Sequence, residues 1–363
     1  MSSDRRQFLK IIAAGAAGAA LPAQVQGSVR PDEPDAAPAQ TALPRWRGFN
    51  LQYLFTAGRY SDPVEDDFRW IRDLGFDFIR LPMSYRIWTE GDDVYKIKEA
   101  PFENIDRVVE WGQKYKIHTS LNFHRGPGYC INRGEIEPFN LWKDKEALDA
   151  FCFHWDIFAK RYRGISSSSV SFDLINEPQS ASDEYERVVR AATGTIRAAD
   201  PKRMVIIDGL KTGNEPVPEV IDLGVGQSCR GYIPAGISHY RASWVDNKST
   251  FPDPVWPDTQ GTTHRWDRQR LEEHYGKWAK LAKKGIGVHC GEAGAYNKTP
   301  HKVVLAWLRD ILEILTGHGI GLALWNFRGP FGIIDSGRKD AAYEDFHGHK
   351  LDRRLLDLLQ EFA

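Results

Sequence analysis

Residues 170–208 read VSFDLINEPQSASDEYERVVRAATGTIRAADPKRMVIID. Two short apolar runs, Val170–Ile175 and Met204–Asp208, flank a segment, Asp183–Ala199, whose apolar residues recur at helical spacing. Asp200-Pro201 ends that helix, because a residue that precedes proline avoids helical backbone angles. A strand followed by a helix and a second strand is the unit of parallel sheets, so this stretch predicts an α/β fold.

The same alternation extends along the chain from Pro44 onward, and most of the predicted strands are rich in Ile, Val, Leu or Phe. The predicted strands are Trp46–Asn50, Phe76–Leu81, His118–Phe123, Val170–Ile175, Met204–Asp208, Gly236–Tyr240, Gly287–Gly291 and Gly321–Trp325. The predicted helices include one capped by Asp62, one around Ile105, and Asp144–Tyr162, Asp183–Ala199, Arg268–Lys284, Thr299–Thr316 and Leu351–Phe362, with a short one near Val217–Leu223.

Eight strand–helix repeats predict a (β/α)8 TIM barrel that forms a single domain over residues 44–363. A doubly wound open sheet is the main alternative. Such a sheet would normally carry a glycine-rich phosphate-binding turn after an early strand, and the sequence has none.

The N-terminal residues predict an export signal. Arg5–Arg6 precedes an apolar, Ala- and Gly-rich run, Ile11–Leu21, with small residues near the end of that run. The string Asp-Arg-Arg-Gln-Phe-Leu-Lys resembles a twin-arginine signal, so we expect a periplasmic or secreted protein. We expect residues 1–23 to be the signal peptide and residues 24–43 a flexible lead-in. The apolar run is too short for a stable membrane span, although an uncleaved anchor is an alternative.

Composition narrows the function. The chain has 48 basic and 49 acidic residues and no large basic block, which disfavours nucleic-acid binding. The four cysteines form no CxxC pair and lack histidines at zinc spacing, so no metal site is predicted. The sequence does not choose between free thiols and any of three disulfide pairings. The 12 Trp residues suit a sugar-binding cleft or a large core equally well.

Polar or aromatic residues follow six of the predicted strands, at the end of a barrel where active sites form. They are Arg80, His124, Asn176, Glu177, His239, Tyr240, Glu292 and Trp325. Glu177 and Glu292 end strands that lie across the barrel from each other, so their carboxyl groups can face one another. A separation of about 5–5.5 Å would suit a retaining glycosidase. The alternative is a structural ion pair that caps the barrel.

This ordered set resembles glycoside hydrolase family 5, the cellulase family, from about Pro44 to the C-terminus. Asn176-Glu177-Pro178 after an apolar strand is similar to the acid/base signature of that family. At the sixth strand end, the family often shows a histidine, one further residue and then a tyrosine. Here Tyr240 follows His239 directly, and Arg241 stands where the tyrosine would fall.

The resemblance implies a role for each carboxylate. Glu177 would be the acid/base and Glu292 the nucleophile of a double displacement. Arg80 would donate hydrogen bonds to Glu292 and keep it ionised, and Asn176 would hold the 2-hydroxyl of the sugar.

Four more residues would bind substrate or position these groups. His124 would bind a substrate hydroxyl, and Trp325 would form the floor under the reacting sugar. His239 would hydrogen-bond Glu177 or orient its neighbours. Tyr240 would contact the nucleophile if the one-residue offset allows it.

The implied activity is retaining hydrolysis of a β-linked glucan-type polysaccharide by a monomer, with neither metal nor organic cofactor. A β-mannanase or an exo-acting β-glucosidase of the same family is an alternative. A metal-dependent barrel hydrolase would need an H-x-H strand end, which is absent. A sugar-binding barrel without activity would have lost Glu177 or Glu292.

We expect the long segment Arg241–Thr263 to be functional. Trp88, Trp244, Trp256 and Phe327 are candidates for stacking on sugars or for packing within loops.

Overall fold

The computed structural model describes residues 42–132, 136–245, 251–258 and 265–362. The predicted signal peptide, residues 24–41 of the predicted lead-in and parts of the segment Arg241–Thr263 lie outside the described residues. Within the part that is described, no helix is both long and apolar enough to cross a bilayer.

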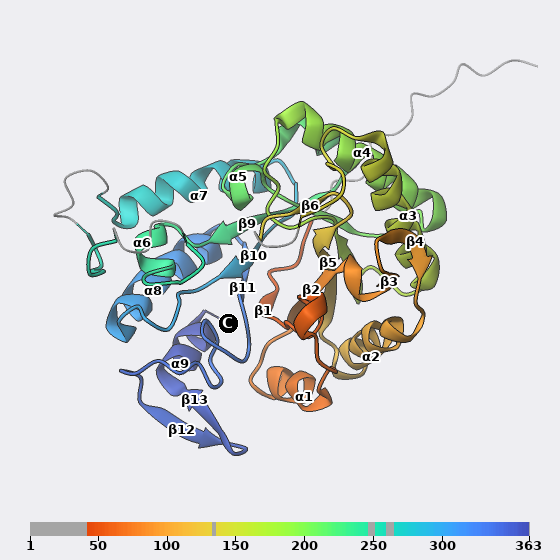
Figure 1. Cartoon of the computed structure of the whole chain (residues 1–363). Coiled ribbons are helices and arrows are strands. Elements are labelled where there is room, and N and C mark those ends of the chain that lie inside the picture. The colour runs from red at the N-terminus through yellow and green to blue at the C-terminus, as the bar shows by residue number, and fades with distance from the viewer. Residues whose placement is uncertain (1–41, 133–135, 246–250, 259–264, 363) are drawn as a thin grey trace, which may run out of the picture. The chain divides into compact units, whose positions relative to one another are not determined.

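Eight parallel strands of the described residues close into a barrel, as predicted (Figure 1). The sheet closes because β2 pairs with both β1 and β5, while β11 pairs with both β1 and β10. The strands are β1 (Arg47–Asn50), β2 (Phe78–Ser84), β5 (His118–Gly126), β7 (Val170–Asp173), β8 (Val205–Asp208), β9 (Gly226–Gly231), β10 (Val288–Ala293) and β11 (Gly321–Leu324).

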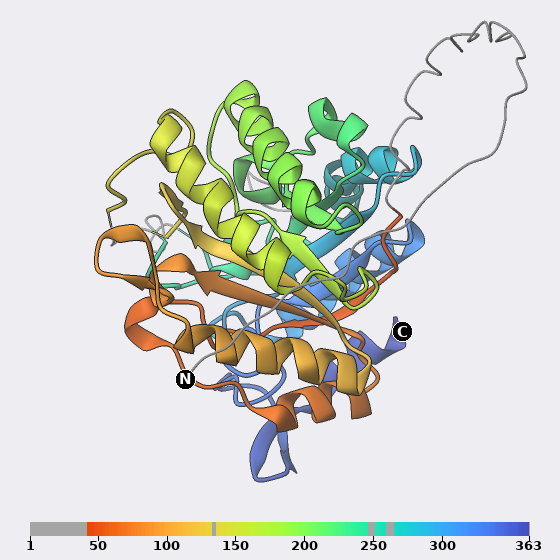
Figure 2. The same cartoon turned by 90° about the vertical axis from the view of Figure 1, so that its right-hand side faces the viewer.

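Helices surround these strands, and Figure 2 shows α3 and α4, coloured yellow to green, side by side against their outer face. The main helices are α1 (Glu65–Asp73), α2 (Ala100–Tyr115), α3 (Lys145–Arg161), α4 (Ser182–Ala199), α7 (Arg268–Ala282), α8 (His301–Gly317) and α9 (Arg353–Glu361). Shorter elements are α5 (Leu210–Gly213), α6 (Ala235–Ser238), η1 (Ala57–Arg59), η2 (Tyr85–Ile87), η3 (Pro218–Leu223), β6 (Tyr129–Cys130), and the hairpins β3 (Thr89–Glu90) with β4 (Asp93–Ile97) and β12 (Tyr343–Phe346) with β13 (His349–Asp352).

The predicted helices are confirmed to within a few residues at each end. One of them, α1, begins at a different residue from the one predicted. Helix α1 begins at Glu65, and its N-cap is Val64 rather than Asp62. The Asp62 carboxylate instead accepts a hydrogen bond of 3.1 Å from the Asn104 side chain in α2. The proposed cap residue therefore ties the loop to a neighbouring helix.

The predicted sixth strand is wrong. Most of Gly236–Tyr240 belongs to the short helix α6, and the sixth barrel strand is β9, which begins ten residues earlier. Strand β9 reads GQSCRG and lacks the branched apolar residues by which the other strands were found. Its buried polar side chains are satisfied by hydrogen bonds; Gln227, for example, bonds the backbone of Val217 in both directions, at 2.9 and 2.7 Å.

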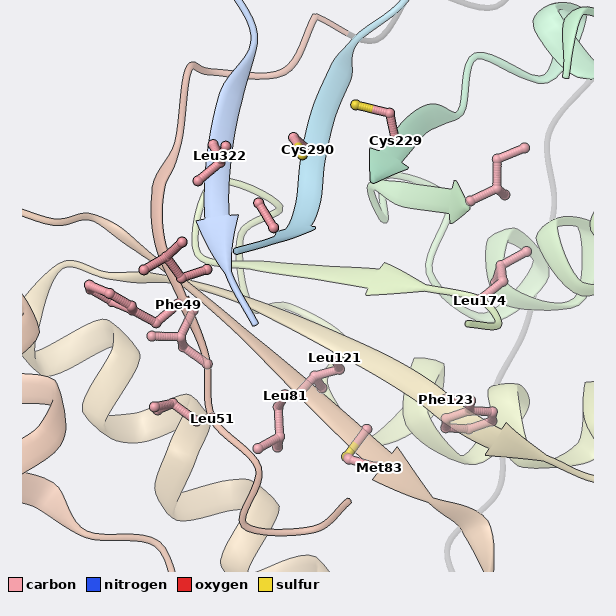
Figure 3. Close-up of a cluster of buried hydrophobic side chains, with 14 of the residues drawn as sticks. Phe49, Leu51, Leu81, Met83, Leu121, Phe123, Leu174, Cys229, Cys290 and Leu322 are labelled. Atoms are coloured by element: carbon pink, nitrogen blue, oxygen red, sulfur yellow. The ribbon is translucent and has the colours of Figure 1, made fainter. Parts of the chain in front are cut away.

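The strand alternation sorts side chains into two environments. Leu81 and Met83 of β2 join a buried apolar cluster with Leu121 and Phe123 of β5 (Figure 3). The same cluster contains Trp155 and Trp278 of the surrounding helices. The alternate residues of β2, such as Arg80, point to the barrel interior, because successive side chains of a strand alternate in direction. The four cysteines form no disulfide with one another, and Cys229 of β9 lies opposite Cys290 of β10 in the strand register.

Candidate active site

A cavity of about 690 Å³ opens at the carboxyl ends of the barrel strands. Its walls come from the strand ends and from the loops that follow them, the part of a barrel where active sites form. Lining side chains include Phe55, Arg59, His124, Glu177, Thr212, Asn214, Arg230, Tyr232, His239, Trp244, Glu292, Trp325 and Phe331. Both predicted carboxylates thus reach one cavity.

Glu292 is positioned by an irregularity in β10. The register against both neighbouring strands shifts just after Cys290, and such a β-bulge changes the direction of the side chains that follow it. Gly291 occupies this position, where a Cβ atom would lie 2.5 Å from the Ser228 hydroxyl oxygen. Asn50 holds the bulge by donating a hydrogen bond of 2.8 Å to the Gly291 carbonyl.

Three donors surround the Glu292 carboxylate, which is buried. Arg80 Nη1 lies 2.7 Å from Oε1, and Arg230 Nη2 lies 3.3 Å from the same oxygen. The Tyr232 hydroxyl donates to Oε2 at 3.0 Å. Burial raises the pKa of Tyr232 well above its usual range, and Glu292 adds to the effect, so this hydroxyl remains a donor. Two cations and a hydroxyl stabilise the anionic form of Glu292.

Glu177 has a different environment. Its backbone is left-handed, with φ of 48°, which is strained for a residue with a side chain. Tyr129 donates to its carbonyl at 2.7 Å, and its own N–H donates to Asp208 at 2.9 Å, so both sides of the strained residue are held. From the described residues its carboxyl group receives one hydrogen bond, 3.1 Å from Arg230 Nε.

The pKa of Glu177 is raised to about 8, chiefly by burial and next by repulsion from Glu292, while Arg230 acts in the opposite direction. Glu177 is therefore mainly protonated at neutral pH and can donate a proton. A buried carboxyl group that can donate a proton, beside a second one contacted by two guanidinium groups, is the arrangement that retaining glycosidases use.

A buried network of charges supports the pair. Arg80 Nε donates to Asp173 at 2.6 Å, while Arg230 donates to both oxygens of Asp208, with Nη1 at 3.0 Å. Two guanidinium groups thus face four carboxyl groups, counting Glu177 and Glu292. Burial also raises the pKa of Asp173 to about 7, although Arg80 acts to lower it.

Asn176 and His124 each present one buried polar atom that has no hydrogen-bond partner among the described residues, Asn176 Nδ2 and His124 Nδ1. The Asn176 carbonyl oxygen accepts from both Arg80 and Arg230 at 2.9 Å, which fixes the orientation of the amide. His124 Nε2 lies 2.6 Å from Asn132 Oδ1. Burial, reinforced by Arg80, lowers the pKa of His124 well below its usual range, so its ring is neutral.

Trp325 lies in the cavity wall with Phe55 and His124, whose ring centroids are 5.5 and 5.6 Å from its own. Among the other aromatic candidates, Trp244 lines the cavity and is 54% exposed. Trp88 and Phe327 are fully buried, and the Trp256 indole donates to Asp310 at 2.8 Å. These last three residues have packing roles.

His239 reaches the cavity, although it follows helix α6 instead of ending a strand. Its Nδ1 lies 2.7 Å from the Ser238 hydroxyl, and its ring centroid lies 5.1 Å from that of Tyr232. Burial lowers the pKa of His239 to about 4. His239 thus packs against the tyrosine that bonds Glu292 and, within the described residues, makes no hydrogen bond to Glu177.

The expectation that Tyr240 contacts the nucleophile is wrong. Its hydroxyl donates to Asp253, the Arg241 guanidinium stacks on its ring at 4.9 Å, and it is not among the described residues that line the cavity. The reason is the misplaced sixth strand. The true strand end reads Arg230-Gly231-Tyr232, which has the spacing of the histidine–x–tyrosine pattern but begins with arginine.

Tyr232, Arg230, Asp173 and Asp208 are the site residues that sequence reasoning missed. Tyr232 was within reach of the pattern, since its spacing from Arg230 is that of the family motif. Asp173 and Asp208 lie within or at the end of correctly predicted strands. Their role in the site could not be predicted, because it depends on the arginines of other strands with which they form ion pairs.

The model of the family Cellulase (glycosyl hydrolase family 5) matches residues 35–329. The chain belongs to glycosyl hydrolase family 5. As a family 5 member it is a glycosidase, and it hydrolyses its substrate with retention of anomeric configuration. The model of the twin-arginine translocation signal matches residues 2–22, so this family 5 enzyme is exported by that route to the periplasm or beyond, as predicted.

Several relatives of this family 5 enzyme are similar over most of their length. Endoglucanase C of Acetivibrio thermocellus (strain ATCC 27405) is 26% identical over 82% of this chain and 94% of its own. A solved structure described as a glycoside hydrolase is 41% identical, with a TM-score of 0.85, over 88% of this chain and 99% of its own. Thermotoga maritima Cel5A, solved with mannotriose, is 22% identical with a TM-score of 0.70, over 87% of this chain and 97% of its own, and supports the fold alone.

Proposed function

We propose that this enzyme is an endo-acting β-1,4-glucanase in which Glu292 is the nucleophile and Glu177 the acid/base. The observation that carries the assignment is the asymmetry of the two carboxyl groups. Glu292 is contacted by two guanidinium groups and a hydroxyl, whereas Glu177 receives a single side-chain hydrogen bond and has a pKa near 8.

In the first step, a Glu292 oxygen bonds to the anomeric carbon as the bond to the leaving oxygen breaks. Glu177 gives its proton to that oxygen and becomes a carboxylate. In the second step, Glu177 takes a proton from water, the water oxygen bonds to the anomeric carbon, and Glu292 leaves as a carboxylate. No metal ion is needed, because the two carboxyl groups carry every proton and bond transfer.

The remaining residues bind the sugar. Asn176 Nδ2 and His124 Nδ1 are one donor and one acceptor available for sugar hydroxyls, and each hydroxyl can satisfy either atom. Trp325 gives an aromatic face for the reacting sugar. We propose His239 as a positioning residue, since it packs on Tyr232, which holds Glu292.

The choice of an endo-acting glucanase rests on the relatives and on the size of the cavity. Three curated relatives are named endoglucanases and a fourth a cellodextrinase. The cavity of about 690 Å³ exceeds what one sugar unit needs. We further propose a monomer whose single catalytic domain, residues 44–363, follows a signal peptide, residues 1–23, and a lead-in, residues 24–43.

Product analysis on a panel of cellulose derivatives, mixed-linkage glucan, xyloglucan and mannan tests the substrate. We expect carboxymethylcellulose to lose viscosity well before reducing ends accumulate, because an endo-acting enzyme cuts inside chains. Release of cellobiose or glucose from chain ends without loss of viscosity would contradict endo action. Higher kcat/KM on mannan would favour the mannanase alternative.

The pH dependence of kcat/KM should show an alkaline limb near pH 8. Glu177 must be protonated to donate, and its pKa is raised to about 8, so kcat/KM should fall as the pH rises through that value. A dinitrophenyl glycoside is the control substrate, because its leaving group departs without a proton. With that substrate kcat/KM should fall less steeply above pH 8, and an unchanged fall would contradict the assignment of Glu177 as the acid.

Trp244 should extend the binding cleft beyond the reacting sugar. It is exposed, lines the cavity and packs against Tyr296 and Phe331, with ring centroids at 4.9 and 6.3 Å. Trp244→Ala should lower kcat/KM for cellohexaose about 3- to 10-fold, the range of one aromatic contact, and leave short aryl glycosides unaffected. Tyr95→Ala removes an aromatic ring of similar exposure that does not line the cavity, and is the matched control. An equal loss for short and long substrates would rule out a distal role.

A further inference from the structure

Arg230 contacts both carboxyl groups of the reacting pair at once. Its Nε donates to Glu177 Oε1 at 3.1 Å, and its Nη2 lies 3.3 Å from Glu292 Oε1. Asp208 holds the same guanidinium through both of its carboxylate oxygens, and the side chain of Arg230 is fully buried. The planar group is thereby fixed between the two glutamates.

Arg80, the other buried arginine, is bound differently. It pairs with Asp173 at 2.6 Å and with Glu292 at 2.7 Å. Among the described residues it makes neither a hydrogen bond nor an ion pair with Glu177. The site therefore has one cation for Glu292 alone and one cation that both glutamates share.

The proposed reaction moves one negative charge between these carboxyl groups. Before the first step the charge is on Glu292. Once the covalent glycosyl-enzyme has formed, Glu292 is a neutral ester and the charge is on Glu177, which has given its proton to the leaving oxygen. The second step returns the charge to Glu292, because Glu177 takes a proton from water.

We propose that Arg230 is the charge-balancing residue of this double displacement, a permanent cation that stabilises whichever of Glu177 and Glu292 is ionised. This inference rests on the proposed roles of the two glutamates. A guanidinium suits the task because it stays protonated in any buried setting and offers donors along two edges. A neutral histidine at this position would carry no positive charge with which to stabilise Glu292 before the first step and Glu177 after it.

Other titratable groups surround the pair. They are Arg80 on β2, His124 on β5, Tyr129 on β6, Asp173 on β7, Asp208 on β8, Tyr232 after β9, His239 after α6 and Cys290 on β10. Removal of Arg230 by itself would leave the buried Asp208 with Arg80 Nη2, at 3.6 Å, as its remaining cationic contact among the described residues, and would destabilise the barrel. The test therefore removes each arginine together with its carboxylate partner.

The test compares kcat/KM against pH for Arg230→Gln/Asp208→Asn with that for Asp208→Asn alone, using an aryl glycoside of the preferred sugar. The two proteins differ only in the Arg230 cation. The pH profile of kcat/KM should be bell-shaped, with an acid limb set by Glu292 and an alkaline limb set by Glu177. Because the Arg230 cation favours the ionised form of both glutamates, its loss should move both limbs to higher pH by about one unit. Rates at the optimum should fall about tenfold or more.

The matched control is Arg80→Gln/Asp173→Asn against Asp173→Asn. Of the two glutamates, Arg80 contacts Glu292 and, within the described residues, not Glu177, so only the acid limb should move upward. Movement of one limb, or of neither limb, in the Arg230 pair would overturn the proposal, since it would make Arg230 a support for one carboxylate or a purely structural residue.

Arg230→Lys is a second variant that keeps the buried positive charge. Both limbs should stay where the wild type has them, because the positive charge is kept, while kcat/KM falls, because a compact ammonium group does not reproduce the planar set of donors that Asp208 fixes between the two glutamates. A shift of either limb by a full unit in this variant would also overturn the proposal. Azide rescue of the glutamate variants tests the roles of Glu177 and Glu292 separately, so the two failures are distinguishable.

Discussion

Replacing Glu292 with alanine should reduce kcat by roughly 10⁴- to 10⁶-fold, the loss typical of a removed nucleophile. Alanine leaves a space beside the anomeric carbon and removes the only group that can bond to it there. Azide should enter that space and restore turnover. Because it would attack from the side of Glu292 and no second displacement would follow, the product should be the α-glycosyl azide, identified by NMR.

Glu137→Ala is the matched control for this variant. Glu137 is also a glutamate held by arginine and tyrosine, at 2.7 Å from both Arg125 and Tyr85, and its side chain is 8% exposed, but it is not among the described residues that line the cavity. This variant should lose stability and keep kcat, and azide should not affect it. Substantial activity of Glu292→Ala without azide would refute the nucleophile assignment.

Glu177→Ala should show the complementary behaviour. Loss of the acid should slow hydrolysis of unactivated glycosides by about 10²- to 10⁴-fold, because the leaving oxygen no longer receives a proton. A dinitrophenyl glycoside should still form the glycosyl-enzyme rapidly, since its leaving group is a stable anion. Accumulation of that intermediate should appear as a burst of dinitrophenolate.

Azide should also accelerate the Glu177→Ala variant, but with the opposite stereochemistry. It would attack the glycosyl-enzyme from the side that water normally takes and give the β-glycosyl azide. The pair of variants therefore assigns a face of the sugar to each glutamate. An α-azide from Glu177→Ala would mean that the two roles are reversed.

Much of this site could be predicted from sequence because seven barrel strands are apolar and alternate with amphipathic helices. Once those strands are located, the residues at their carboxyl ends are known to lie at the same end of the barrel. Glu177 and Glu292, 115 positions apart, were brought into one site by this argument alone.

Strand β9 escaped prediction for a physical reason. Arg230 on its interior face and Gln227 on its outer face both pair with polar groups of neighbouring elements, and an apolar pattern does not reveal such a strand. The error displaced the sixth strand end and led to Tyr240 instead of Tyr232. The bulge at Gly291 and the contacts of Arg230 with two glutamates could not be predicted, because they depend on the register between strands.

The most direct test of the central claim is covalent trapping with a dinitrophenyl 2-deoxy-2-fluoro-β-cellobioside, followed by proteolysis and mass spectrometry. The fluorine slows both steps, and the activated leaving group lets the first proceed, so the glycosyl-enzyme should accumulate. We predict a single fluorocellobiosyl group on Glu292, in an ester that turnover slowly releases. A label on Glu177 or on any other residue would contradict the account.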